Sequence, residues 1–356
     1  MGKIKFTDKN GSFVIENPEN YSGLYLPLAG EMGLKSNITP SMAGDAKTDQ
    51  NHFLLEPVSI ENLHNNKNGR NFWCRIEGNG IWSVSGASAL QEAEKFTASQ
   101  DESKIEAGLM WQKLTRIPKK YGIKSEVLSF VPTDKNIEIM YVTLENTSAE
   151  SIKFTPVAAI PLYGRSADNI RDHRHVTSLL HRISTQEYGI EVSPVLSFDE
   201  RGHQKNSTTY FVYGSKEDGT KPETFYPTNE MFIGEGGSFL NPEAVRTVKE
   251  GVKAGAKIQG KEAVGALAFE SVELKAGEKT GYIVVAGITD DVLEIEKTTV
   301  LYRTKEAVLE CFENTKRHWV EKVNIDFEMN DDSVDNYLKW ICFQPILRRI
   351  YGCSFL

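Results

Sequence analysis

Ser103-Lys104-Ile105-Glu106-Ala107-Gly108-Leu109-Met110-Trp111-Gln112 is the stretch that decides the fold class. Its apolar positions, Ile105, Ala107, Leu109 and Trp111, alternate with Lys104, Glu106, Gly108 and Gln112. A period of two residues is typical of a strand that buries one face and exposes the other. We therefore predict a half-buried strand over residues 104–112.

Similar segments follow this one along the chain. Residues 121–131, 136–146 and 151–162 have strand-like composition and the short spacing of an antiparallel meander, and residues 210–213, 264–272 and 282–285 add further strands. Many strands without intervening helices predict a mainly β fold, a large antiparallel β-sandwich over residues 1–289. The region 216–260 is rich in Gly, Pro and charge, which favours long loops.

From Thr304 onward the apolar period becomes helical. Residues 290–324 are expected to form a helical linker. A second helix follows in residues 325–356, with Asp331 or Asp332 as its N-cap. We expect this helix to begin a helical domain that the chain does not finish.

Two features of that last helix carry expectations of their own. Pro345 predicts a break or a kink, because proline lacks the N–H that the helix needs. An uncovered apolar stripe that favours self-association is predicted at Tyr337, Leu338, Ile341, Ile346 and Ile350.

Composition excludes several classes of protein. The 356 residues include 40% hydrophobic and 25% charged residues, as in ordinary globular proteins, and the net charge of -8 argues against nucleic-acid binding. No apolar run approaches the length of a membrane span, so no membrane partner is expected. The four cysteines are scattered without a CxxC pair, which favours reduced thiols and a cytoplasmic location.

Residues 168–175, Asp-Asn-Ile-Arg-Asp-His-Arg-His, form the most unusual polar stretch. Three interpretations remain open for it: a metal site, a loop that binds sugar or phosphate, and a structural network of salt bridges. A metal is disfavoured because the other histidines stand at no diagnostic spacing, so we expect none. Trp73, Trp82 and Trp111 offer faces for stacking on sugar rings, but their strand-like surroundings favour a place in the core.

Four stretches match a known family. They are residues 38–47 (ITPSMAGDAK), 70–73 (RNFW) with 82–86 (WSVSG), 166–175 (SADNIRDHRH) and 343–352 (FQPILRRIYG). On these residues the chain resembles the N-terminal part of the glycoside hydrolase family 94 phosphorylases, most closely the 1,2-β-oligoglucan phosphorylases. The resemblance runs over nearly the whole chain.

The resemblance implies a galactose-mutarotase-like supersandwich, linker helices and the start of an (α/α)6 barrel, usually in a homodimer. The implied reaction is inverting phosphorolysis of a β-glucan to α-glucose 1-phosphate, with inorganic phosphate as co-substrate and no other cofactor. The general acid is expected beyond Leu356, so no catalytic residue is assigned. Substrate-binding residues are expected at Arg165, Asp168, Asn169, Arg171, Asp172, His173, Arg174 and His175.

Two functional classes follow from these expectations. In the first, the chain is the front part of a phosphorylase, binds β-glucan oligosaccharide, forms a dimer or joins a C-terminal catalytic portion, and is inactive alone. In the second, it is a free-standing β-sandwich that binds carbohydrate or mediates assembly without catalysis.

Overall fold

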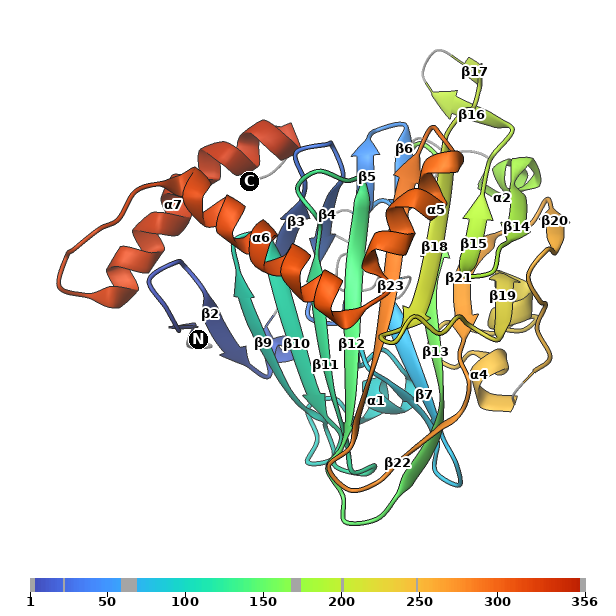
Figure 1. The fold of residues 1–356 in the computed structure, drawn as a ribbon, viewed down its shortest axis with the longest axis horizontal. Helices are drawn as coiled ribbons and strands as arrows, with labels where there is room; N and C mark the ends of the chain where they lie inside the picture. The colour runs from blue at the N-terminus through green and yellow to red at the C-terminus, as the bar shows by residue number, and fades with distance from the viewer. Residues whose placement is uncertain are drawn as a thin grey trace.

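The computed structural model describes residues 4–21, 23–58, 69–167, 174–199, 202–247 and 249–352. Figure 1 shows a broad, twisted sheet with helices lying across its front and further strands behind it. The predicted antiparallel β-sandwich is confirmed.

The broad sheet has eleven strands, and its central pairs are antiparallel. In spatial order they are β1 (Lys5–Phe6), β2 (Phe13–Glu16), β9 (Glu102–Gly108), β10 (Trp111–Ile117), β11 (Ile123–Phe130), β12 (Ile137–Asn146), β23 (Lys279–Thr289), β18 (Thr209–Lys216), β15 (Gly189–Val192), β14 (Arg182–Thr185) and β20 (Lys257–Gln259).

The second sheet has six strands: β19 (Thr224–Thr228), β21 (Ala263–Ala268), β13 (Ile152–Leu162), β7 (Asn71–Ile76) and β8 (Gly80–Ser83), with β22 (Val272–Leu274) also paired to β13. A four-stranded sheet contains β3 (Leu26–Ala29), β4 (Lys35–Ile38), β5 (Ala46–Asp49) and β6 (His52–Leu55). A separate hairpin of β16 (Leu196–Asp199) and β17 (Gly202–Lys205) stands at one end of the molecule (Figure 1).

The main core lies between these sheets. The broad sheet contributes residues such as Ile105, Leu114 and Val142, the second sheet Phe72 and Phe154, and all five are at most 1% exposed. Burial of aromatic and branched side chains from facing sheets is the dominant favourable term in such a fold.

Helices cover the outer faces of both large sheets. The outer face of the broad sheet packs against α5 (Leu293–Thr299), η4 (Val300–Tyr302) and α6 (Lys305–Val323), and that of the second sheet against α3 (Asn229–Phe232) and α4 (Glu243–Thr247). The remaining helical segments are α1 (Ala89–Glu94), α2 (Arg174–Thr177), α7 (Asp332–Tyr351), η1 (Pro18–Asn20) and η3 (Ser178–Leu180).

The prediction of one strand over residues 104–112 is wrong. β9 ends at Gly108 and β10 begins at Trp111, and these two residues pair across a turn made by Leu109 and Met110. Both turn residues are buried against the C-terminal helices, and Met110 has a φ of 64°. Because this turn is covered rather than solvated, its residues are apolar and carry no turn signal.

Two further expectations need correction. β13 does not continue the meander of β10, β11 and β12, because it crosses into the second sheet and pairs with β7 and β21. Region 216–260 is not only loops, since it contains β19, α3, α4 and β20. These elements are three to five residues long, which is too short for a periodic pattern to reveal.

Both long C-terminal helices are capped, and the cap of the second is one of the two aspartates that the sequence suggested. The Thr304 hydroxyl accepts a hydrogen bond from Ala307 N at 3.4 Å, and an Asp331 carboxylate oxygen accepts from Ser333 N at 2.9 Å. α7 continues through Pro345, so the predicted break is wrong. Within the described residues, no helix has the length and apolar character needed to cross a membrane.

One face of α7 packs on the sandwich, which the sequence did not predict. Phe343 and Leu347 are buried with Trp319 of α6 and the turn at Leu109, and the Tyr351 hydroxyl donates to the carbonyls of Leu28 and Ser36. The predicted apolar stripe is therefore only partly uncovered. Its exposed members are Tyr337 (64%) and Ile341 (49%), whereas Leu338, Ile346 and Ile350 are half-buried.

Candidate functional site

The site predicted at residues 165–175 is described only in part. Arg165 lies just after β13, and the backbone of Arg174 and His175 belongs to α2. Asp168, Asn169, Arg171, Asp172 and His173 lie outside the described residues.

Arg165 is an anchored, buried cation. Its Nη2 donates to Glu262 Oε2 at 2.8 Å, its guanidinium lies 5.1 Å from the centre of the Tyr163 ring, and only 4% of the residue is exposed. Its Nε and Nη1 make no hydrogen bond to any described residue. Two nitrogens of this anchored guanidinium are thus buried without a partner among the described residues.

His181 lies beside this cation and is fully buried. Burial, the largest cause, and the charge of Arg165 together lower the pKa of the imidazole to about 3. A histidine with such a pKa is neutral near pH 7, so its Nδ1 contact with the Lys261 carbonyl at 3.2 Å does not require a charge.

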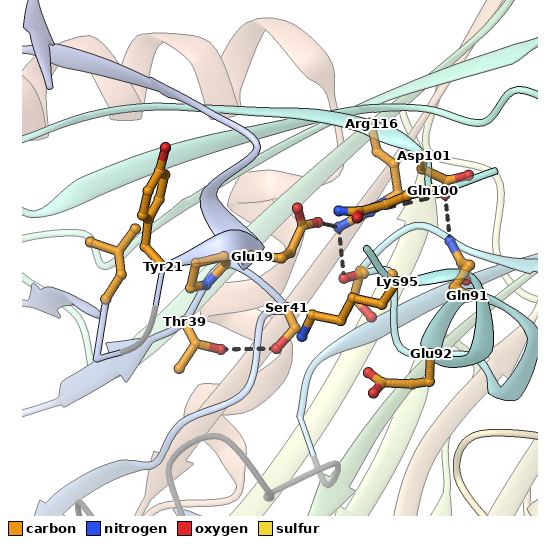
Figure 2. A pocket seen from close by; sticks show the side chains of 14 residues that line it. Glu19, Tyr21, Thr39, Ser41, Gln91, Glu92, Lys95, Gln100, Asp101 and Arg116 are labelled. Atoms are coloured by element: carbon orange, nitrogen blue, oxygen red, sulfur yellow. Dashed lines mark hydrogen bonds and ion pairs between the residues drawn. The ribbon is translucent and has the colours of Figure 1, made fainter. Parts of the chain in front are cut away.

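A pocket opens at a different place, between η1, the segment after β4, the segment after β8, α1, the segment before β9 and the end of β10 (Figure 2). It contains about 700 Å³ of space, including the part open to solvent at its mouth. Its lining is mostly polar: Glu19, Tyr21, Leu24, Thr39, Pro40, Ser41, Ser85, Gly86, Gln91, Glu92, Lys95, Gln100, Asp101 and Arg116. None of these residues was predicted as a site residue from the sequence.

Arg116 is the most constrained charged residue of the pocket, and it is 3% exposed. Its Nε donates to Val84 O at 3.1 Å, and its Nη2 donates to Ser85 O at 3.2 Å and to the Glu19 carboxylate. The remaining nitrogen, Nη1, has Asp101 Oδ2 at 3.9 Å, which is too far for a hydrogen bond. Among the described residues Nη1 has no hydrogen-bond partner, so its N–H groups can donate to a ligand.

Gly86 allows the guanidinium to lie where it does. A Cβ atom on Gly86 would be 2.5 Å from Arg116 Cζ, and the Gly86 φ of 81° is one that side-chain-bearing residues rarely adopt. The close approach of backbone to guanidinium therefore requires glycine at this position.

The two buried carboxylates of the pocket are engaged in hydrogen bonds. Asp101 Oδ2 accepts from Trp82 Nε1 at 3.0 Å and from Gln91 Nε2 at 2.7 Å, and Glu19 accepts from Arg116 and Ser103. Both carboxylates are thus held in place by protein donors, and their oxygens can also accept hydrogen bonds from the hydroxyl groups of a ligand.

The rest of the lining adds mobile polar groups around this fixed floor. Lys95 extends from α1 toward Ser41 in Figure 2, and Glu92 lies on the same helix. The Ser41 hydroxyl shares a 3.2 Å hydrogen bond with Thr39. Donors and acceptors thus alternate around the pocket, an arrangement that can bind a ligand carrying neighbouring hydroxyl groups.

The three tryptophans that offered faces for stacking are core residues. Trp73 and Trp82 are 1% exposed and Trp111 is 8% exposed, so the interpretation as core is confirmed. Within the described part of the chain, no cluster of three or more His, Cys, Asp or Glu side chains is arranged to hold a metal ion.

Comparison with known families identifies the fold. A family model described as the glycosyl hydrolase 94 supersandwich domain matches residues 41–305, which is most of the chain. The chain belongs to this family. Matching residues of the supersandwich include Ser41, Ser85, Gly86 and Arg116 of the pocket, whereas Glu19 and Tyr21 precede the matched range.

A solved structure shares the fold of this supersandwich chain at low sequence identity. A bacterial glucoamylase complexed with acarbose is 9% identical with a TM-score of 0.51, and the match covers 96% of this chain and 43% of the glucoamylase. A candidate kojibiose phosphorylase from the human microbiome is 10% identical with a TM-score of 0.48. The match covers 97% of this chain and 42% of the phosphorylase. The chain thus spans less than half the length of either protein. No curated protein matches it.

Proposed function

We propose that this chain is the N-terminal, carbohydrate-contacting portion of an inverting β-glucan phosphorylase that acts on 1,2-β-linked oligoglucans. The observation that carries the proposal is the match of the supersandwich domain over residues 41–305. The four stretches that resemble 1,2-β-oligoglucan phosphorylases support the choice of substrate. A C-terminal portion with the general acid and the phosphate site completes the proposed enzyme.

We also propose that the chain alone does not catalyse phosphorolysis. Cleavage of a glycosidic bond needs an acid positioned to protonate the leaving oxygen, and such a positioned acid contributes roughly 10²–10⁴-fold to the rate. In the pocket described above, the Glu19 and Asp101 carboxylates are already occupied by hydrogen bonds from protein groups.

The experiment for this proposal is a turnover assay. The purified chain is incubated with a 1,2-β-oligoglucan and inorganic phosphate, and α-glucose 1-phosphate is measured against a blank without protein. We expect no release above the blank. Release that grows with protein concentration would contradict the assignment of catalysis to another portion of the enzyme.

The proposal also includes a homodimer. Four apolar side chains form an exposed ridge on α5 and the residues beside it, with exposed fractions of 47–73%: Val292, Leu293, Val300 and Leu301. Apolar ridges of this kind mark association surfaces. Sedimentation velocity is expected to give a dimer for the wild type and a monomer for Leu293→Glu with Leu301→Glu. A dimer that persists in the double variant would show that the interface lies on another surface.

A cytoplasmic location completes the proposal. Cys74, Cys311 and Cys342 are free thiols, and burial raises the pKa of the Cys74 thiol. Reduced cysteines of this kind are typical of proteins from a reducing compartment.

A further inference from the structure

We infer that the pocket around Arg116 binds one hexose unit of a neutral glucan, as an accessory site within the supersandwich. This inference rests on the proposed function, because it names the surface through which the chain contacts carbohydrate. Three features of the pocket support it: its charge, its hydrogen-bonding groups and the aromatic ring of Tyr21 in its lining.

Charge favours a neutral ligand over an anion. The cations Lys95 and Arg116 face three carboxylates, those of Glu19, Glu92 and Asp101. The pocket therefore carries a negative formal charge, which repels phosphate or a carboxylate. A neutral ligand has no such penalty.

Hydrogen-bonding geometry favours a ligand with neighbouring hydroxyls. Each sugar hydroxyl both donates and accepts, so it can accept from Arg116 Nη1 and donate to the Asp101 carboxylate, whose nearest oxygen is 3.9 Å from that nitrogen. Because Arg116 and Asp101 are held by other protein groups, they need no rearrangement on binding. Ser41 and Lys95 provide further donors on the opposite side of the pocket.

Tyr21 adds an aromatic ring to the pocket lining. It is 37% exposed, unlike the buried tryptophans of the sandwich, and in Figure 2 its ring stands apart from the hydrogen-bonded groups. An exposed aromatic ring offers an apolar face to the C–H groups of a pyranose ring and a hydroxyl to its edge. The polar groups and this ring together fit a single sugar unit.

The test is a calorimetric titration of the whole chain with a 1,2-β-linked glucotetraose. Ser41→Trp fills the pocket, and Lys95→Ala removes a donor without touching the buried network. Their matched controls are Ala149→Trp and Lys275→Ala, at exposed positions outside the pocket lining. Circular dichroism of each variant verifies the fold.

We expect both pocket variants to lower the affinity for the tetraose by roughly tenfold or more. Lys95→Ala loses a hydrogen bond from a charged group, and Ser41→Trp loses the space for the sugar. The control variants should bind as the wild type does. A wild type that binds the tetraose, with both pocket variants unchanged, would overturn the pocket assignment and leave the proposed function standing. Binding of phosphate at this pocket in place of the tetraose would overturn the assignment of a neutral ligand. If the wild type binds no tetraose, both this inference and the proposed contact with carbohydrate are overturned.

Discussion

At the scale of single residues, Gly86 and Arg116 determine the shape of the pocket floor. The guanidinium lies against the glycine at a distance that leaves no room for a Cβ atom. Gly86→Ala is expected to displace Arg116 from Glu19 and to lower the free energy of unfolding by about 2 kcal/mol or more in urea denaturation.

Gly219→Ala is the matched control for that substitution. Gly219 has a φ of 87°, close to that of Gly86, but a Cβ atom there would meet nothing within 4 Å. Gly219→Ala therefore introduces the same backbone strain as Gly86→Ala but no contact with Arg116. Equal losses of stability in the two variants would contradict the role of Gly86 in placing the guanidinium.

His181 gives the fold a pH dependence of its own. Its pKa is about 3 in the folded chain, against about 6.5 in an unfolded one, so the unfolded state binds the proton first as the pH falls. Stability should therefore decrease between pH 7 and pH 5 by on the order of 2 kcal/mol. Urea denaturation at both pH values measures the decrease, and His181→Gln should reduce it. An equal decrease in the variant would assign the effect to other groups.

At the scale of elements, α7 has two faces with different roles. Its inner face carries Phe343, which is fully buried and packs edge-on against Trp319 and Trp340. Its outer face carries Tyr337 and Ile341, which are exposed. Removal of the whole helix would uncover Trp319 and Val323, so truncation is not a clean test of the exposed face.

Substitutions on each face separate the two roles. Tyr337→Lys with Ile341→Lys should reduce self-association in light scattering and leave the free energy of unfolding nearly unchanged, since both side chains are exposed. Phe343→Ala should lower that free energy by about 3–5 kcal/mol, because it leaves a cavity. A double lysine variant that unfolds as easily as Phe343→Ala would show that the outer face is packed.

At the scale of the whole molecule, the period of two residues was sufficient to predict the sandwich, and the helical period with the cap at Asp331 marked the C-terminal helices. The hairpin at Leu109 was hidden because the helices bury its turn. The pocket was missed because its residues come from six separate segments between residues 19 and 116. One signal was present: Arg116 follows Gln112 and Leu114 on the inward-facing side of β10, and a charged residue at such a position needs a buried partner.

The central claim is that this supersandwich chain contacts β-linked glucan. The most direct measurement is a calorimetric titration of the wild-type chain with 1,2-β-linked glucotetraose, with maltotetraose as the control of equal length and α linkage. The account predicts saturable binding of the β-linked tetraose at one site per chain, and binding of maltotetraose weaker by roughly tenfold or more. No binding of the β-linked tetraose, or equal binding of both, would contradict it.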